Sequence, residues 1–159
     1  MCRTPEEMRR ALRACPDALV QEHLVGPEFS ADCVSDADGP SLVHLRLRHR
    51  TRAGMSTVTE AFTDADLEKA IMRVLGDLRF AGPSCVQGFL TPEGPRLTEV
   101  NVRFGGGCAL SQFSGGGLVQ TYLRALVSGE PLPAENFRYA AGAKLVRPLD
   151  FQYIPEELS

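Results

Sequence analysis

The sequence predicts an α+β fold with a mainly antiparallel sheet flanked by helices. Short apolar segments of strand length follow one another with only turn residues between them, as in hairpins. Helical patterns stand between runs of such segments instead of after every strand, which favours α+β over alternating α/β architecture. The chain has 159 residues without an internal repeat or a long linker, so we expect residues 1–159 to form a single domain.

Three helices are predicted. The first begins at Thr4, which can act as the N-cap, and Glu7 closes a capping box. Its apolar face comprises Met8, Ala11, Leu12 and Cys15. The second helix is capped by Thr63 and carries apolar residues at helical spacing. The third covers about residues 118–127 and is stopped by Gly129.

The predicted strands are short segments bounded by Gly, Pro or Asp. Residues 18–25 are expected to form a buried strand that ends at Gly26. The later strands cover residues 28–34, 42–50, 56–62, 84–90, 96–103 and 139–146. Turn residues at positions 36–39 and a tight loop around Glu93 indicate two hairpins.

Composition excludes several classes of protein. The formal net charge is −3, which argues against nucleic acid as the main partner. No apolar run approaches the roughly 18 residues of a membrane span, and no signal peptide is recognisable, so we expect a cytoplasmic protein without a membrane partner. The 5 cysteines are scattered, which favours reduced thiols over a zinc site.

Polar side chains in the Glu93 hairpin predict a metal site. Glu99, Asn101 and Arg103 alternate and so share one face of their strand. If the loop is centred on Glu93, Gln87 falls directly opposite Glu99, and oxygen-bearing side chains converge as Mg²⁺ or Mn²⁺ would require. A two-residue loop would shift the register by one and turn Gln87 away. The alternative interpretation is a solvated strand face without function.

These residues also carry a family resemblance. The segment Gln21-Glu22-His23-Leu24-Val25-Gly26-Pro27-Glu28, then Gln87, then Glu99-Val100-Asn101-Val102-Arg103, resembles the C-terminal half of an ATP-grasp domain. The nearest likeness is to the carbamoyl-phosphate-synthetase-like ligases of that superfamily. The resemblance covers nearly the whole chain and implies the C-terminal lobe of an ATP-grasp fold.

The resemblance implies roles at the nucleotide end of the site. Glu22 and Leu24 would lie on a hinge strand whose backbone groups hydrogen-bond adenine. Glu28 matches the acid that accepts the ribose hydroxyls. Without the resemblance, an ordinary buried strand would be the better interpretation of residues 21–25.

It also implies roles at the phosphate end. Gln87 and Glu99 match metal ligands, with Glu99 bridging two Mg²⁺ ions, and Asn101 completes the shell of the second ion. Arg103 matches the arginine that steadies the γ-phosphate or the acyl-phosphate intermediate.

A second basic feature is less specific. Arginines alternate with other residues along residues 42–52, and one face carries His44, Arg46, Arg48, Arg50 and Arg52. A solvated strand face is the commoner explanation of such alternation. In the resembling subfamily, arginines on the equivalent strand face the phosphate and acceptor cleft, which favours Arg52, beside Gly54, as a functional residue.

The resemblance implies a parent enzyme that is an ATP-dependent carboxylate–amine or carboxylate–thiol ligase. Its partners would be ATP, a small carboxylate substrate and an amine acceptor. The N-terminal lobe, which supplies a lysine and a glycine-rich loop, is expected to be missing, because only one helix precedes the hinge segment and no lysine precedes Lys69. The chain alone is therefore expected to be inactive. The alternatives are a non-catalytic nucleotide- or metal-binding regulatory module and an interaction domain, and a homo-oligomer stays open.

Overall fold

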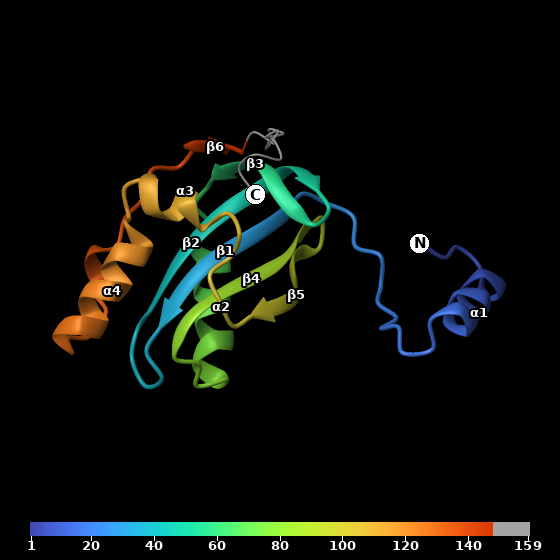
Figure 1. The fold of residues 1–159 in the computed structure, drawn as a ribbon, viewed down its shortest axis with the longest axis horizontal. Coiled ribbons are helices and arrows are strands. Elements are labelled where there is room, and N and C mark those ends of the chain that lie inside the picture. The colour runs from blue at the N-terminus through green and yellow to red at the C-terminus, as the bar shows by residue number, and fades with distance from the viewer. Residues whose placement is uncertain (148–159) are drawn as a thin grey trace, which may run out of the picture.

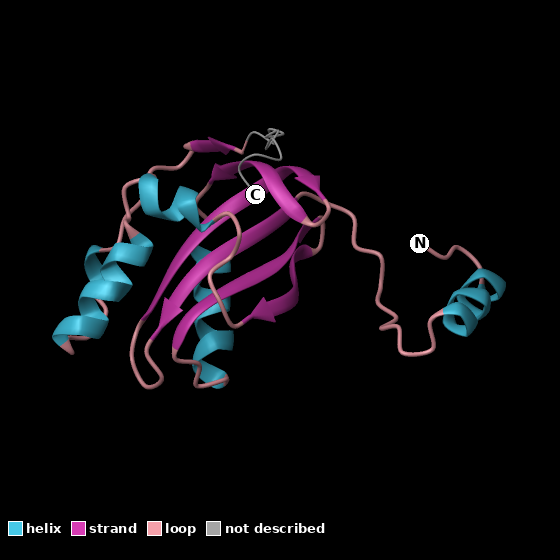
Figure 2. Cartoon of the chain, in the orientation of Figure 1, coloured by secondary structure: helices cyan, strands magenta, loops and turns pink. Residues whose placement is uncertain are grey.

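A six-stranded antiparallel sheet forms the centre of the computed structural model, which describes residues 1–147 (Figures 1 and 2). In spatial order the strands are β5 (Gly94–Asn101), β4 (Gly82–Thr91), β1 (Glu28–Ser35), β2 (Ser41–Arg52), β3 (Met55–Ala61) and β6 (Lys144–Val146). Hairpins join β1 to β2, β2 to β3, and β4 to β5. The predicted α+β class with a mainly antiparallel sheet is confirmed.

The main core lies between the sheet and α2 (Ala65–Asp77), which covers one face. Alternate residues of β1 point to this face, and they include Phe29 and Ala31, each with no exposed surface. The helix presents Leu67, Ile71 and Leu75 at intervals of four residues. The helix begins one residue later than predicted, because Asp64 rather than Thr63 caps it by accepting from the backbone N–H groups of residues 66 and 67.

A second, smaller core lies on the opposite face. Here α4 (Leu118–Ser128) packs Leu118 against Val34 of β1 and Leu42 of β2, together with Leu132. The short helix α3 (Cys108–Phe113) and the turn η1 (Ala134–Asn136) complete this side. The helix α3 escaped prediction because its six residues are too few for a helical period and lie between two runs of glycine.

The β4–β5 hairpin confirms the predicted pairing by an unexpected route. Thr91 pairs with Gly94, so the loop is a two-residue turn, which alone would turn Gln87 away from Glu99. A bulge restores the register, since Gly88 pairs with Leu97 but Gln87 pairs with Glu99, and Thr98 is the extra residue. Its hydroxyl donates to the carbonyl of Gln87 at 3.2 Å.

The N-terminal segment corrects one prediction. The helix α1 (Pro5–Ala14) forms with Thr4 as its N-cap, but none of its residues is buried. Residues 18–25 form no strand, and Leu19 and Val25 are 81% and 69% exposed. No strand of the described residues pairs with this segment, so its apolar pattern alone does not make a strand. Figure 1 shows α1 well away from the sheet, at the end of an extended stretch.

That stretch meets the sheet at Gly26. A Cβ atom there would lie 2.1 Å from the carbonyl oxygen of Leu90, so no larger residue fits. The amide of Leu90 donates to the carbonyl of Pro27 at 2.9 Å, which ties the start of β1 to the end of β4.

Two strand ends also differ from prediction. The final strand was expected over residues 139–146 but covers only three of them, because Tyr139 turns inward to make side-chain contacts instead of pairing. The strand β5 ends at Asn101, two residues before Arg103. None of the helices among residues 1–147 has the length and apolar character needed to cross a bilayer.

Candidate functional site

One face of the sheet is lined by polar side chains. These side chains lie together because opposed residues on neighbouring strands share a face. The residues of this polar face are Glu28, Ser30, Asp32, His44, Arg46, Arg48, Cys85, Gln87, Glu99 and Asn101. Part of it is covered by α3, α4 and the glycine loop at residues 105–107. We call the covered part, around Asp32, His44 and Arg46, the buried half. We call the part around Glu28, Arg48, Gln87, Glu99 and Asn101 the open half, since Glu28, Gln87 and Asn101 are partly exposed and Glu99 is exposed.

Arg48 occupies the centre of the open half. Its Nη1 donates to Gln87 Oε1 at 3.1 Å and to the carboxylate of Glu28. Its Nε donates to Ser56 Oγ at 2.9 Å, and its Nη2 donates to the Gly54 carbonyl at 2.7 Å. The Arg48 side chain is only 7% exposed, whereas that of Glu28 is 30% exposed. The structure therefore brings Glu28 and Gln87 together through an arginine that the sequence did not single out.

The edge strand β5 supplies the second part of the open half. Asn101 Nδ2 donates to Glu99 Oε1 at 2.7 Å, so the two side chains lie on one face as predicted. Gln87 is directly across from Glu99. Arg103 does not continue this row, because the chain bends after Asn101; its Nη1 donates to the Phe104 carbonyl at 3.1 Å, and its side chain is exposed. Arg103 therefore lies outside the strand that was expected to carry it.

The buried half centres on an ion pair. Arg46 Nε donates to Asp32 Oδ2 at 2.8 Å, with side-chain exposures of 3% and 0%. Ser111 of α3 donates to the same oxygen at 3.2 Å. Burial opposes the charge of Arg46, but the Asp32 carboxylate outweighs that effect and raises the pKa of the guanidinium. Prediction of a solvated face was thus wrong for Arg46 and Arg48.

The glycine loop closes directly on this pair. A Cβ atom on Gly107 would lie 2.6 Å from the Arg46 guanidinium, and one on Gly105 would lie 2.7 Å from Asp32 Oδ1. These glycines permit close packing on charged groups. Arg46 Nη1 is buried and has no hydrogen-bond partner within the described part of the chain.

His44 joins the buried half to the C-terminal part of the chain. Its Nε2 lies 2.6 Å from Ser114 Oγ, and its ring lies 4.0 Å from that of Tyr139, centroid to centroid. Burial lowers the pKa of His44 to about 4, against the opposing charge of Asp32. His44 is therefore neutral at neutral pH. It is part of the scaffold beneath the site, which the arginine alternation gave no means of recognising.

Three predicted residues lie apart from the open half. Glu22 is exposed and lines a cavity of about 490 Å³ between α1 and residues 18–23, and Leu24 is partly exposed in the same extended stretch. Arg52 is exposed at the last position of β2, next to the β2–β3 turn. Within residues 1–147, none of the three contacts Gln87 or Glu99 through a side-chain hydrogen bond.

Sequence reasoning also missed Asp32, Arg46, Arg48 and Arg147. Arg147 follows β6, and its guanidinium donates to the carbonyl of Gly106 in the glycine loop. The alternation along β2 was the available signal for Arg46 and Arg48, but it did not show which arginines would be covered. For Arg147 the sequence holds no local signal, since the contact spans 41 positions.

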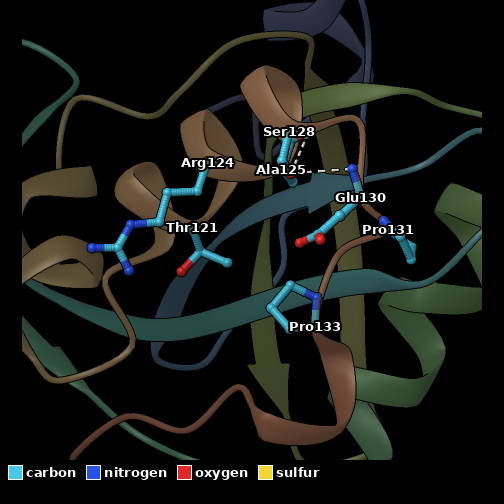
Figure 3. A pocket seen from close by; sticks show the side chains of 7 residues that line it. All are labelled: Thr121, Arg124, Ala125, Ser128, Glu130, Pro131 and Pro133. Carbon is cyan, nitrogen blue, oxygen red and sulfur yellow. Dashed lines mark hydrogen bonds between the residues drawn. The ribbon is translucent and has the colours of Figure 1, made fainter.

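The described residues hold other features that could be mistaken for a site. A cavity of about 230 Å³ at the end of α4 is lined by Thr121, Arg124, Ala125, Ser128, Glu130, Pro131 and Pro133 (Figure 3). It is smaller than the roughly 300–1,000 Å³ typical of ligand pockets and contains none of the polar-face residues. In residues 1–147, no group of three His, Cys, Asp or Glu side chains is arranged to hold a metal ion, so a cation would need amide oxygens as well.

Comparison with known proteins gives a family and a fold. The family described as "ATP-grasp in the biosynthetic pathway with Ter operon" matches residues 14–145. The biotin carboxylase domain of a single-chain bacterial carboxylase is similar in fold, with a TM-score of 0.61 and 17% identity over 89% of this chain. A variant of Rhizobium etli pyruvate carboxylase with the allosteric activator acetyl coenzyme A has a TM-score of 0.62 and 15% identity over 76% of this chain.

The chain spans 40% and 12% of those two structures. At identities this low, the likeness concerns the fold alone. No curated protein sequence matches the chain significantly.

Proposed function

The chain belongs to the ATP-grasp family, and we propose that its polar face binds ATP and a divalent cation as part of a ligase. The family match confirms the ATP-grasp resemblance. The proposed reaction goes beyond what that match shows. It transfers the γ-phosphate of ATP to a small carboxylate with release of ADP, and an amine or another nucleophile then attacks the acyl carbon with release of phosphate, as in carbamoyl-phosphate-synthetase-like ligases. The observation that carries the proposal is the pairing of Gln87 with Glu99, with Asn101 beside them.

The donor set fits a hard cation. Glu99 supplies a carboxylate, and Gln87 and Asn101 supply neutral amide oxygens, which are ligands suited to Mg²⁺ or Mn²⁺. Glu99 is exposed, and its only side-chain partner among the described residues is Asn101, so its second oxygen is available. A bound cation would neutralise phosphate charge during transfer.

The nucleotide would extend from this edge toward Glu28. We propose that Glu28 accepts the ribose hydroxyls, because its partly exposed carboxylate lies on the same face as Gln87, with Arg48 between them. The backbone of Glu22 and Leu24 would then bind adenine. Arg103 would steady the γ-phosphate, with Arg52 at the acceptor side of the site.

A second lobe is needed to enclose such a ligand. The lysines of the sequence are Lys69, on α2, and Lys144, on β6, where it pairs with Glu60. Neither belongs to the polar face. We therefore propose that a lobe outside residues 1–147 covers the phosphates and that the chain alone does not turn over ATP.

Cation binding tests the site. We expect Mn²⁺ to raise the thermal unfolding temperature of the wild-type chain, because a ligand stabilises the state that binds it. Glu99→Gln should abolish this response. Glu93→Gln, an exposed change in the hairpin turn, is the matched control and should keep it. Equal responses of wild type and Glu99→Gln would refute the metal site.

Nucleotide binding and turnover test the rest. With one wall of the pocket present, we expect an ATP dissociation constant of about 0.1–1 mM, with NMR shifts at residues 22–28. Phosphate release should stay far below the roughly 1 s⁻¹ of a complete enzyme. Turnover at that rate by the chain alone would refute the need for a second lobe.

The second candidate is a nucleotide-binding module without catalysis. The lack of a lysine on the described polar face favours it. A panel of carboxylates and amines, supplied together with a separately expressed lysine-bearing lobe, separates the two candidates: restored phosphate release supports the ligase, and its continued lack supports the module.

A further inference from the structure

Arg48 is held in place by groups that take no part in the proposed site. Its Nε and Nη2 donate to Ser56 Oγ and to the Gly54 carbonyl, both in the β2–β3 hairpin. These two bonds fix the plane of the guanidinium, since a planar fork held at two nitrogens cannot rotate freely. The third nitrogen, Nη1, is thereby aimed across the sheet toward β1 and β4.

That one nitrogen holds two side chains from different strands. Nη1 carries two hydrogens, and it donates both to Glu28 on β1 and to Gln87 Oε1 on β4, the latter at 3.1 Å. The Arg48 side chain is only 7% exposed, and hydrogen bonds from a charged guanidinium are roughly twice as strong as neutral ones. The separation between Glu28 and Gln87 is thus set by a single group.

We infer that Arg48 is a positioning residue that presents the Glu28 carboxylate to the ribose and orients the Gln87 amide oxygen at the cation edge. This inference rests on the proposed function. Arg48 itself makes no contact with the nucleotide in this arrangement. It acts by restricting two flexible side chains before the ligand arrives, which lowers the entropy lost on binding.

The orientation of Gln87 has an electrostatic consequence. Its Oε1 uses one lone pair for Arg48 and keeps the other. A cation sharing that oxygen is repelled by the guanidinium, so it must lie on the side away from Arg48, which is the side of Glu99. The negative charge of Glu28 beside Arg48 reduces this repulsion. The two ends of the site are therefore coupled through Arg48.

The test compares binding of ATP and of 2′,3′-dideoxy-ATP, each measured with Mg²⁺ by calorimetry. A hydrogen bond from the ribose to a held carboxylate should make the wild-type chain prefer ATP by about tenfold. Arg48→Lys keeps the charge but cannot bond to Ser56, Gly54, Glu28 and Gln87 together. We expect the preference to fall to about twofold in this variant. Arg50→Lys, exposed on the same strand, is the matched control and should keep the wild-type ratio.

The ratio of the two affinities separates positioning from stability, since a general loss of structure weakens the binding of both nucleotides equally. An unchanged ratio in Arg48→Lys would overturn the inference while leaving ATP binding, and so the proposed function, intact. Failure of the wild-type chain to bind ATP would instead refute the proposed function and the inference with it.

A second variant covers the case in which Arg48→Lys does not fold. Ser56→Ala keeps Arg48 and its charge but removes one anchor. We expect its preference for ATP over the dideoxy nucleotide to fall by a factor of two to three. We also expect the side-chain amide signals of Gln87 to shift in the ligand-free NMR spectrum. Retention of both the ratio and the Gln87 signals in Ser56→Ala would overturn the inference.

Discussion

Arg46 and Arg48 stand two positions apart on β2, share one face of the sheet, and each pair with a carboxylate on β1. Around Arg46, α3 and the glycine loop exclude water, and its partner Asp32 has no exposed surface. Around Arg48, the hairpin end of β2 leaves its partner Glu28 30% exposed. The same residue type in the same pattern is therefore part of the scaffold at one position and of an accessible site at the next.

The difference follows from what covers each position. A fully buried ion pair must remain paired, because a lone charge in the interior is very costly. A partly exposed pair can exchange its partner for a ligand or for water at little cost. We expect substitutions in the buried half to affect folding and substitutions in the open half to affect binding.

The largest effect is expected for Asp32→Asn. The substitution leaves Arg46 buried without its counter-ion and should lower the free energy of unfolding by about 3–5 kcal/mol, measured by urea denaturation. Glu28→Gln is the matched control, because it removes the partner of Arg48 at a partly exposed position, and it should cost no more than about 1 kcal/mol. Similar losses for the two variants would show that both halves are equally solvated.

Acid should destabilise the buried half through His44. Its pKa in the folded chain is about 4, below the ordinary 6.5, because it is buried. The unfolded chain therefore binds the proton more readily than the folded chain does. The contribution of neutral His44 to the free energy of unfolding is complete above pH 6.5 and is lost as the pH falls toward 4. The loss should amount to about 2–3 kcal/mol.

Denaturation of wild type and His44→Gln across pH 7.5 to 4 measures this contribution as the difference in slope. His23→Gln, an exposed change outside the sheet, should keep the wild-type slope. If His44→Gln shows the full acid dependence, protonation of His44 is not its source, and the nearby Asp32–Arg46 pair becomes the candidate.

Gly107→Ala tests how tightly the loop closes on Arg46. The added Cβ atom would lie 2.6 Å from the guanidinium, so either the loop or the arginine must move, at a cost of about 1–3 kcal/mol. Gly106→Ala places its Cβ atom in open space and should be nearly neutral. Thermal unfolding of the two variants gives the comparison, and equal stability would mean that the Arg46 side chain moves aside at no measurable cost.

The smallest effect on stability is expected for Glu99→Gln. Glu99 is exposed at the sheet edge, and its side-chain partner is Asn101 of the same strand. The change in the free energy of unfolding without metal should be within about 0.5 kcal/mol. A loss above about 2 kcal/mol would place Glu99 in the scaffold with Asp32 instead of in the open half.

Much of the sheet could be predicted because its strands depend on local patterns. Alternation and turn residues locate β1, β2, β3 and β4 within one to two residues at each end. Residues 18–25 have the same apolar character and form no strand, since a strand also needs a partner, which local pattern does not reveal.

The site shows the same limit. Gln87, Glu99 and Asn101 come from one hairpin, so their proximity is a local property and was predicted, although not for the right reason. Arg48 contacts Glu28 and Gln87, which are separated from it by 20 and 39 positions in the sequence. The helix that covers Arg46, α3, lies still further along the chain. Pairings across such distances require the assembled sheet.

The bulge at Thr98 bears on how the length of this hairpin can vary in evolution. It lets Leu97 pair with Gly88 and Glu99 pair with Gln87, so residues two apart on β5 face opposite sides. Deletion of Thr98 would give a regular hairpin that still opposes Gln87 to Glu99. Deletion of Val100 would turn the amide of Asn101 to the other side of the sheet. The site therefore tolerates a lost residue before Glu99 but not between Glu99 and Asn101, and related sequences are better aligned on the Glu99–Asn101 spacing than on the length of the loop.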